Sequence, residues 1–307
     1  MPLAYVSHPD CLLHDMGAGH PESPERLTAI EDQLIASGLD MWLRRYDAPF
    51  VTREQLLRAH DAAYLDEVER RSPVEGRVLL DQGDTSMNPH SHRAALRAAG
   101  AGVLAVDLLM RGEVESAFCA VRPPGHHAER GRAMGFCIFN NVAIAALHAL
   151  EAHGLSRVAI VDFDVHHGNG TEQILGGDPR VLFASTFRHP FYPYSGADVA
   201  NERVVNVPLP AGTRGPAFRA AVEDRWLPAL EAFRPELILV SAGFDAHRED
   251  DMGGFGLVED DYAWVTAALK QVARRHAAGR VASCLEGGYA LSALGRSVVA
   301  HLNALIE

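Results

Sequence analysis

The sequence has few cysteines, no long apolar run and no excess of basic residues. Its four cysteines, Cys11, Cys119, Cys137 and Cys284, lack the paired CxxC spacing of structural zinc sites. Three of them lie in apolar segments, so we expect reduced, buried thiols and a cytoplasmic protein. No segment reaches the roughly 20 apolar residues needed to cross a membrane, and the amino terminus shows no signal-like run, so we expect no membrane partner.

Acidic residues outnumber basic residues by 40 to 28, which gives a formal net charge of −12. This balance disfavours nucleic acid as a partner and mildly favours cationic substrates. With 307 residues, 48% of them hydrophobic, the chain is long enough for one large α/β domain over residues 1–307. It contains no internal repeat, low-complexity tract or linker that would divide that domain.

Short apolar segments alternate with helical stretches along most of the chain, a pattern typical of a parallel sheet. A helix is expected from about Asn141, and apolar residues at helical spacing from Tyr262 to Val272 predict another, which acidic residues precede. The segments expected to form strands are 116–121, 157–163, 180–186, 203–208, 236–243 and 280–285.

The stretch Asp162-Phe163-Asp164-Val165-His166 is the most informative part of the chain, and it follows the apolar run 157–161. If the strand continues through it, side-chain alternation places Asp162, Asp164 and His166 on one side. Two buried carboxylates cost roughly several kcal/mol unless a cation or dense hydrogen bonding compensates them. The pattern therefore predicts a site for zinc or iron with an open position for water, although a single aspartate there is equally well explained as a helix cap.

Two adjacent histidines follow another apolar run. Pro123, Pro124 and Gly125 exclude a helix and form a stiff loop that presents His126 and His127. Surface exposure, metal binding and acid/base catalysis would each explain such a pair, and histidine is the side chain best suited to proton transfer near neutral pH.

Two further expected strands end in residues that carry chemistry. Asp245 follows the strand at 236–243, at the edge of the sheet where open α/β folds place their sites. Tyr289 follows two glycines after the strand at 280–285. That flexible turn allows the Tyr289 hydroxyl to point into a cleft, although simple packing would also explain a tyrosine there.

Together these segments resemble the histone deacetylase superfamily, over nearly the whole chain. The pattern is most similar to the class II branch, which includes bacterial deacetylase-like amidohydrolases and acetylpolyamine amidohydrolases. The resemblance implies the α/β arginase/deacetylase fold, a single large, mostly parallel β-sheet with helices on both faces. The motifs that carry it are His20-Pro-Glu-Ser-Pro-Glu-Arg26, Asp84-Thr85, Arg122-Pro-Pro-Gly-His-His127, Asp162-Phe-Asp-Val-His-His-Gly-Asn-Gly170, Ser241-Ala-Gly-Phe-Asp245 and Glu286-Gly-Gly-Tyr289.

The resemblance also implies which metals are bound. One catalytic zinc ion would be held by Asp164, His166 and Asp245. A potassium ion beneath it, bound partly through backbone carbonyls, would be held by Asp162, Asp164, His166, Ser185 and Thr186. A second potassium ion would involve the stretch 175–181 and Arg203.

By the same resemblance, the tandem histidines have Asp162 and Asn169 as their partners. A charged aspartate favours the protonated form of its histidine, whereas a neutral asparagine gives no such support, so we expect different roles. We assign His127 as the general base and then the general acid, and His126 as electrostatic support. Tyr289 would donate a hydrogen bond to the oxyanion.

Six positions match the wall and mouth of the family's substrate tunnel: His20, Asp84, Gly135, Phe136, Tyr192 and Met252. The loops around the mouth are short, which suggests an open entrance without dimer-forming insertions. Phe187 and Tyr194 stand where many relatives carry His and Gly. Because of these two differences, the resemblance does not determine the shape of the tunnel.

Met252 lies seven positions after Asp245, where the eukaryotic polyamine-selective relative has a glutamate that pairs with a distant ammonium. An apolar thioether suits a peptide backbone or a hydrocarbon chain instead. Nearby Glu249, Asp250 and Asp251 would partly replace the missing carboxylate.

The expected activity is removal of acetyl or other acyl groups from the ε-amine of lysine by metal-activated water. An acetylpolyamine deacetylase would share this chemistry and differ at the mouth, so acylated lysine side chains and small acylated amines are both expected ligands. A non-catalytic acetyl-lysine-binding protein is a third interpretation, which the intact set of chemical positions disfavours. A ureohydrolase would need extra ligands for two manganese ions, which these motifs lack.

Overall fold

Eight strands form one parallel sheet in the computed structural model, which describes residues 3–83, 85–198 and 201–307. Each pairing between neighbouring strands of this sheet in the described residues is parallel. The order across the sheet is β2 (Leu43–Asp47), β1 (Leu3–Ser7), β5 (Ser116–Cys119), β10 (Val281–Leu285), β9 (Leu237–Ala242), β6 (Val158–Asp162), β7 (Val181–Arg188) and β8 (Val204–Leu209).

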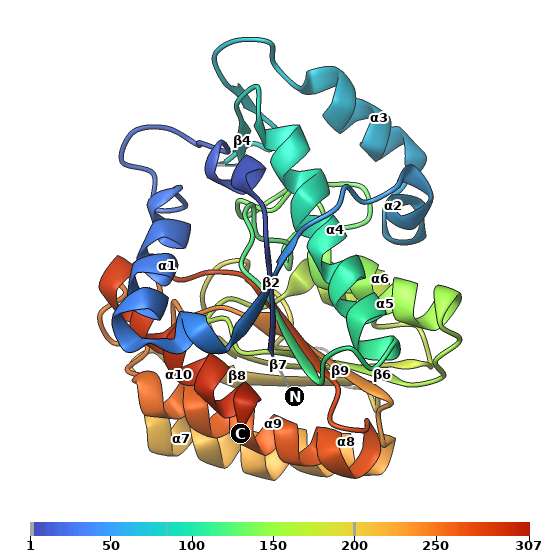
Figure 1. Ribbon diagram of the computed structural model, residues 1–307, viewed down its shortest axis with the longest axis vertical. Helices are drawn as coiled ribbons and strands as arrows, with labels where there is room; N and C mark the ends of the chain where they lie inside the picture. Colours follow the sequence, from blue (N-terminus) through green and yellow to red (C-terminus); the bar gives the residue numbers. More distant parts are fainter. Residues whose placement is uncertain (1–2, 84, 199–200) are drawn as a thin grey trace.

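Helices cover both faces of the sheet (Figure 1). On one face α4 (Ser91–Met110) packs beside α5 (Asn141–Ala152), and on the other α10 (Leu291–Ile306) lies between α9 (Glu259–His276) and α1 (Glu25–Ser37). The remaining helical and strand elements are η1 (Pro9–Leu12), η2 (Leu39–Trp42), α2 (Arg53–Ala59), α3 (Ala62–Arg71), β3 (Val78–Leu79), β4 (Ser86–Met87), α6 (Asn169–Leu175), α7 (Gly215–Ala221), the π-helical η3 (Val222–Trp226) and α8 (Leu227–Phe233).

The six expected strands are confirmed to within two residues at each end, and the helix expected from about Asn141 and the one expected around 262–272 are confirmed as α5 and α9. The strands β1 and β2 were not predicted. β1 is a short buried strand at the amino terminus, and β2 forms an edge of the sheet with Arg44, Arg45 and Asp47 exposed. Charged residues are typical of an edge strand, but they remove the apolar pattern by which a strand is recognised in a sequence.

The alternation argument for the metal ligands was wrong in its geometry. β6 ends at Asp162, so Asp164 and His166 lie in the bend that follows the strand. They share a site because this bend folds over the carboxyl edge of the sheet, and not because they alternate along a strand.

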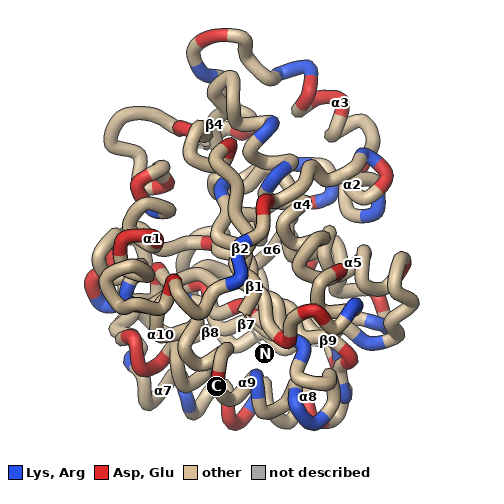
Figure 2. The backbone as a smooth tube through the Cα atoms, in the orientation of Figure 1, with Lys and Arg blue, Asp and Glu red and all other residues tan. Residues whose placement is uncertain are grey.

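All four cysteines are free and buried, as expected. Among the helices in the described part of the chain, none has both the length and the apolar character needed to cross a bilayer. In the view of Figure 2, basic and acidic residues are interspersed over the helices and do not gather into one continuous basic face.

Candidate active site

Three ligand-type side chains converge at the carboxyl edge of the sheet. Asp164 and His166 come from the bend after β6, and Asp245 comes from the turn after β9. The Nδ1 atom of His166 lies 3.0 Å from Oδ1 of Asp164 and 3.1 Å from Oδ2 of Asp245, and all three side chains are buried. One imidazole and two carboxylates in this arrangement fit a zinc ion with one position left open.

The backbone orients the two carboxylates. Asp245 Oδ1 accepts a hydrogen bond from the Val165 amide at 2.9 Å, and Asp164 Oδ2 accepts one from the Gly287 amide at 2.9 Å. A Cβ atom at Gly287 would lie 2.1 Å from Asp245 Oδ2 and 2.7 Å from Asp164 Oδ2. Only glycine therefore allows this strand end to approach both ligands.

The charges in this cluster are strongly coupled. Burial and the neighbouring Asp164 raise the pKa of Asp245 to about 7. Burial opposes protonation of His166, but its hydrogen bonds to the two carboxylates raise its pKa to about 9. Two buried carboxylates that share one imidazolium proton form the type of environment that a divalent cation stabilises.

The first of the tandem histidines has a charged partner. His126 Nδ1 lies 3.0 Å from Oδ2 of Asp162, and its Nε2 lies 3.7 Å from Oδ2 of Asp164. Burial lowers the pKa of His126, but the two carboxylates outweigh it and hold that pKa well above the usual value. This environment favours the imidazolium form of His126.

The second histidine has a neutral partner. His127 Nδ1 lies 2.8 Å from Oδ1 of Asn169, and the Asn169 amide nitrogen donates to Oε1 of Glu129 at 2.8 Å. Because Glu129 fixes which end of the amide faces His127, the His127 proton lies on Nδ1 and the Nε2 lone pair is free. Burial, together with His126 and His166, holds the pKa of His127 well below its usual value. The His127 and His166 ring centroids are 5.8 Å apart, so this base lies beside the ligand cluster.

Two glutamates that help to position His126 and His127 were not predicted from the sequence. Glu129 orients Asn169, and Glu286 accepts hydrogen bonds from the amides of Gly125 and His126 at 2.6 and 3.1 Å. Burial raises the pKa of Glu286 to about 7. The motif Glu286-Gly-Gly-Tyr289 signalled that Glu286 belongs to the region, but its contact with a loop about 160 residues away is a product of the fold.

The early His20-Pro-Glu motif has a structural role through Glu22. Glu22 is fully buried and pairs with Arg122 at 2.5 and 2.6 Å and with Arg26 at 3.1 Å. Burial alone would raise the pKa of Glu22, but Arg122, His14 and Arg26 hold it well below the usual range. Removing one member of such a buried network typically costs about 3–5 kcal/mol.

Arg26 connects this network to the turn that carries Tyr289. Its side chain donates to the carbonyls of Gly288, at 2.7 Å, and Glu286, and its guanidinium lies 5.0 Å from the centre of the Tyr289 ring. Gly288 has φ of +123°, a backbone conformation that favours glycine, as expected for this turn. Burial, and more weakly Asp245 and Asp164, raises the pKa of Tyr289 well above its usual value, so its hydroxyl stays protonated.

The expected tunnel residues lie around this centre. The Phe136 ring contacts His20 and Tyr289 edge to face, with centroids 4.7 and 6.0 Å apart. Tyr192 lies perpendicular to His127 at 5.2 Å. A Cβ atom at Gly135 would lie 2.4 Å from the His127 ring, so this position also requires glycine.

Met252 is exposed and lies close to the tyrosine turn. Asp250 accepts hydrogen bonds from the amides of Met252 at 3.0 Å and Tyr289 at 2.6 Å, which ties the two segments together. Tyr289 and His20 also line a surface hollow of about 790 Å³, together with the exposed Leu13. Asp84, the remaining expected tunnel residue, lies outside the described residues.

The loop after β7 contains an aromatic contact that was not expected. Phe191 stacks on the ring of His166 with centroids 5.3 Å apart and an interplanar angle of 18°. The sequence offers several aromatic residues in this loop, and composition alone does not distinguish them. Phe187 is buried against His167 at 4.6 Å, and Tyr194 is 74% exposed with φ of +61°. The departure at position 194 therefore lies at the surface.

One observation fits the expected potassium site. Ser185 is paired with Asp162 in adjacent strands, and Thr186 follows it; both side chains are buried. The Ser185 hydroxyl has no hydrogen-bond partner within the described residues. A buried oxygen next to Asp162 suits a monovalent cation, which prefers oxygen ligands.

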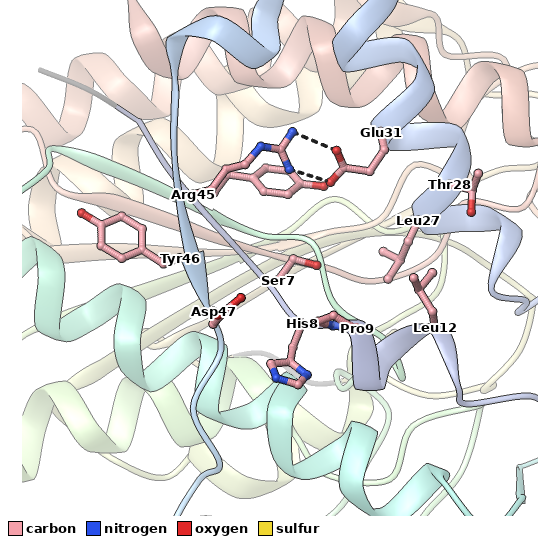
Figure 3. Close-up of a pocket in the computed structure, with 11 residues that line it drawn as sticks. Ser7, His8, Pro9, Leu12, Leu27, Thr28, Glu31, Arg45, Tyr46 and Asp47 are labelled. Atoms are coloured by element: carbon pink, nitrogen blue, oxygen red, sulfur yellow. Dashed lines mark hydrogen bonds and ion pairs between the residues drawn. The ribbon is translucent and has the colours of Figure 1, made fainter.

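A separate hollow of about 410 Å³ lies where β1 and β2 end, beside α1 (Figure 3). Arg45 closes one side of it through two hydrogen bonds to Glu31, at 3.0 and 2.8 Å. Its lining includes none of the three metal-type ligands and neither His126 nor His127, so it is distinct from the candidate active site.

Comparisons with known proteins agree with this geometry. Residues 20–305 match the histone deacetylase domain family. A histone deacetylase-like amidohydrolase of Pseudomonas aeruginosa is 41% identical over 279 residues, which cover 89% of this chain and 73% of the relative. Human polyamine deacetylase HDAC10 is 39% identical over 327 residues, covering 100% of this chain and 48% of the relative, so the chain spans about half the length of that protein. The solved structure of the HDA15 HD domain is similar with a TM-score of 0.93 at 35% identity, covering 100% of this chain and 90% of that one.

Proposed function

The chain belongs to the histone deacetylase family and has its arginase/deacetylase fold, as the motifs predicted, and we propose that it is a zinc-dependent lysine deacylase. The observation that carries this proposal is a pair of adjacent histidines, one bonded to a carboxylate and the other to an amide, beside three metal-type ligands. An amide hydrolase needs a base, a positive charge and an activated water in one place, and this arrangement provides for all three.

Asp164, His166 and Asp245 would hold the zinc ion. When bound, zinc supplies a Lewis acid that polarises the acyl carbonyl and lowers the pKa of the attacking water from about 15.7 toward roughly 7. The rings of His127 and Tyr192 lie beside His166, with centroids 5.8 and 6.1 Å from it, so a substrate carbonyl and a water would be accommodated next to them.

His127 moves the proton. Its free Nε2 accepts a proton from the water as the water oxygen attacks the acyl carbon. The same nitrogen then gives that proton to the departing amine as the C–N bond breaks, and the second proton of the water passes from the acid product to the amine, which leaves a carboxylate and a protonated lysine side chain. His126 remains an imidazolium and stabilises the negative charge that develops on the oxygen.

Tyr289 supplies a second stabilising contact. Its high pKa keeps the phenol protonated, so it acts as a hydrogen-bond donor to the oxyanion and not as a base. Phe136 and Arg26 contact its ring, and His20 packs against Phe136, which together restrict where the hydroxyl points.

The mouth favours acyl-lysine over acetylated polyamines. Glu249 is paired with Arg296 at 2.8 Å, and both oxygens of Asp250 accept backbone hydrogen bonds. Glu249 and Asp251 are both exposed, and within the described part of the chain Asp251 is the one of the three acidic residues before Met252 that carries no such bond. A distant ammonium on a polyamine therefore meets a single solvated carboxylate, whereas a peptide meets the apolar Met252. Polyamine deacetylation remains the second candidate because HDAC10 carries that activity in its name.

The remaining assignments belong to this proposal. Potassium beneath the zinc site is supported by the Ser185 hydroxyl, which has no hydrogen-bond partner among the described residues, and the second potassium near Arg203 rests on resemblance alone. A cytoplasmic location is supported by four free cysteines. The net charge of −12 supports the absence of a nucleic-acid partner.

One substrate panel tests the proposal. The purified, zinc-loaded protein is assayed against acetyl-lysine peptides, longer acyl-lysine peptides, acetylspermidine and acetylputrescine. We expect acyl-lysine peptides to give the highest kcat/KM. A preference of tenfold or more for acetylpolyamines would favour the second candidate, and binding of acetyl-lysine peptides without any turnover would favour a non-catalytic binding protein.

A further inference from the structure

A second group of metal-type side chains lies outside the active site. Asp107 is on α4, His148 is on α5, and His153 directly follows α5. The Nε2 atoms of both histidines approach the same carboxylate oxygen, Asp107 Oδ1, at 2.8 and 2.7 Å. The two rings are nearly perpendicular, with centroids 5.3 Å apart. Nothing in the proposed mechanism uses this group.

The group lies at the opposite end of α5 from the active site. The first residue of α5, Asn141, donates a hydrogen bond to the carbonyl of Pro123 in the histidine loop, at 3.2 Å. His148 and His153 are at the other end of this 12-residue helix, which is about 18 Å long at 1.5 Å per residue. A metal bound there would be separate from the catalytic ligands.

We infer that Asp107, His148 and His153 form a second binding site for a zinc ion, with water completing the coordination. Two imidazole nitrogens and one carboxylate oxygen are typical zinc ligands, and small shifts of these side chains would open the roughly 2 Å metal–ligand distances that zinc requires. The side chains are 8%, 24% and 30% exposed for His148, His153 and Asp107, so an ion can enter although the ligands are held in place. The bound ion would tie the end of α4 to the end of α5.

Arg58 opposes metal binding and provides a sharp test. Its Nη1 lies 3.3 Å from Nδ1 of His148, and its Nη2 is bonded to Glu54 at 3.0 Å. In this arrangement His148 donates from Nε2 to Asp107 and accepts at Nδ1. When Nε2 binds a metal, the proton moves to Nδ1 and faces the guanidinium, so Arg58 must turn away. Arg58→Met should therefore tighten zinc binding, on the order of tenfold, because it also removes a neighbouring positive charge.

The experiment counts zinc in the natural protein and in four variants after equilibration with micromolar zinc and gel filtration. We expect about two ions per chain in the natural protein, and one each in Asp245→Ala and in His153→Gln. The double variant should hold none. Glutamine retains a donor for Asp107, so the fold is preserved, and deacylase activity of His153→Gln should be unchanged. His276→Ala is the matched control, because His276 is paired with one carboxylate, that of Glu231, at 2.8 Å, without a second histidine.

Calorimetry and thermal unfolding provide further readouts. In the Asp245→Ala protein, zinc should bind with a stoichiometry of one and raise Tm by several degrees, and Arg58→Met should tighten this binding. Adding either His148→Gln or His153→Gln to the Asp245→Ala protein should abolish both the zinc binding and the rise in Tm. The inference is overturned if the Asp245→Ala protein binds no zinc or binds it with a dissociation constant of about 1 mM or weaker. It is also overturned if the Asp245→Ala protein still binds zinc after either histidine has been replaced by glutamine. An absence of deacylase activity in the substrate panel would not change zinc binding at Asp107, His148 and His153, so each of the two proposals can be refuted without the other.

Discussion

Replacing Tyr289 by phenylalanine removes one hydroxyl and leaves its surroundings intact. The ring contacts of Phe136 and Arg26 do not involve the hydroxyl, and Asp250 holds the backbone amide of residue 289. None of the three expected metal ligands is altered. We therefore expect Tyr289→Phe to fold normally and to bind one catalytic metal ion, so that any loss of rate reflects the lost donor.

The expected loss follows from the state of the hydroxyl. Burial keeps the pKa of Tyr289 well above its usual value, so the group that is removed is a neutral donor on a half-buried side chain. Removing one such donor from an oxyanion typically costs about 2.7–4 kcal/mol, which corresponds to a 100- to 1000-fold fall in kcat. Because the contact strengthens only as the charge develops, KM should change little.

The assay compares two substrates and one control protein. With an acetyl-lysine peptide, kcat of Tyr289→Phe should fall by this factor, whereas a trifluoroacetyl-lysine peptide, whose oxyanion is intrinsically more stable, should lose less. Tyr194→Phe is the matched control because Tyr194 is 74% exposed. Near-normal turnover of the acetyl peptide by Tyr289→Phe would remove Tyr289 from the mechanism, and so would an equal loss in both tyrosine variants.

Asp245→Ala should lose both the catalytic metal and activity, since two protein ligands would remain; metal analysis that finds the ion still bound at the active site contradicts the ligand assignment. Asn169→Asp should shift the acidic limb of the kcat/KM profile to higher pH, because a carboxylate beside His127 raises the pKa of the base that must be neutral; an unchanged limb would argue against His127 as that base. Met252→Glu should lower the ratio of kcat/KM for acyl-lysine to that for acetylspermidine by about ten- to a hundredfold, because a charge-assisted contact contributes roughly 1.5–3 kcal/mol. An unchanged ratio would place Met252 away from the substrate.

The parts of the site that the sequence predicted are those in which neighbouring residues carry the chemistry. Asp162, Asp164 and His166 lie within five residues of one another, and the two histidines are adjacent, so their proximity in space follows from the chain itself. Six strands were also predicted, because buried parallel strands are apolar along their whole length. The edge strand β2 was not, since its outward side chains are charged.

The tertiary structure decided every relation between distant segments. The contacts of Glu286 with the amide of Gly125, of Glu129 with Asn169 and of Glu22 with Arg122 join residues between 40 and 161 positions apart. Local patterns report burial and backbone conformation, and they contain no information on which strand end meets which loop. The protonation states of His126 and His127 also depend on such contacts, because a pKa is set by the charges and the burial around a group and not by its neighbours in the chain. The sequence by itself determined the chemical groups of the site and its position at the carboxyl edge of the sheet, and the fold determined their geometry and their charge.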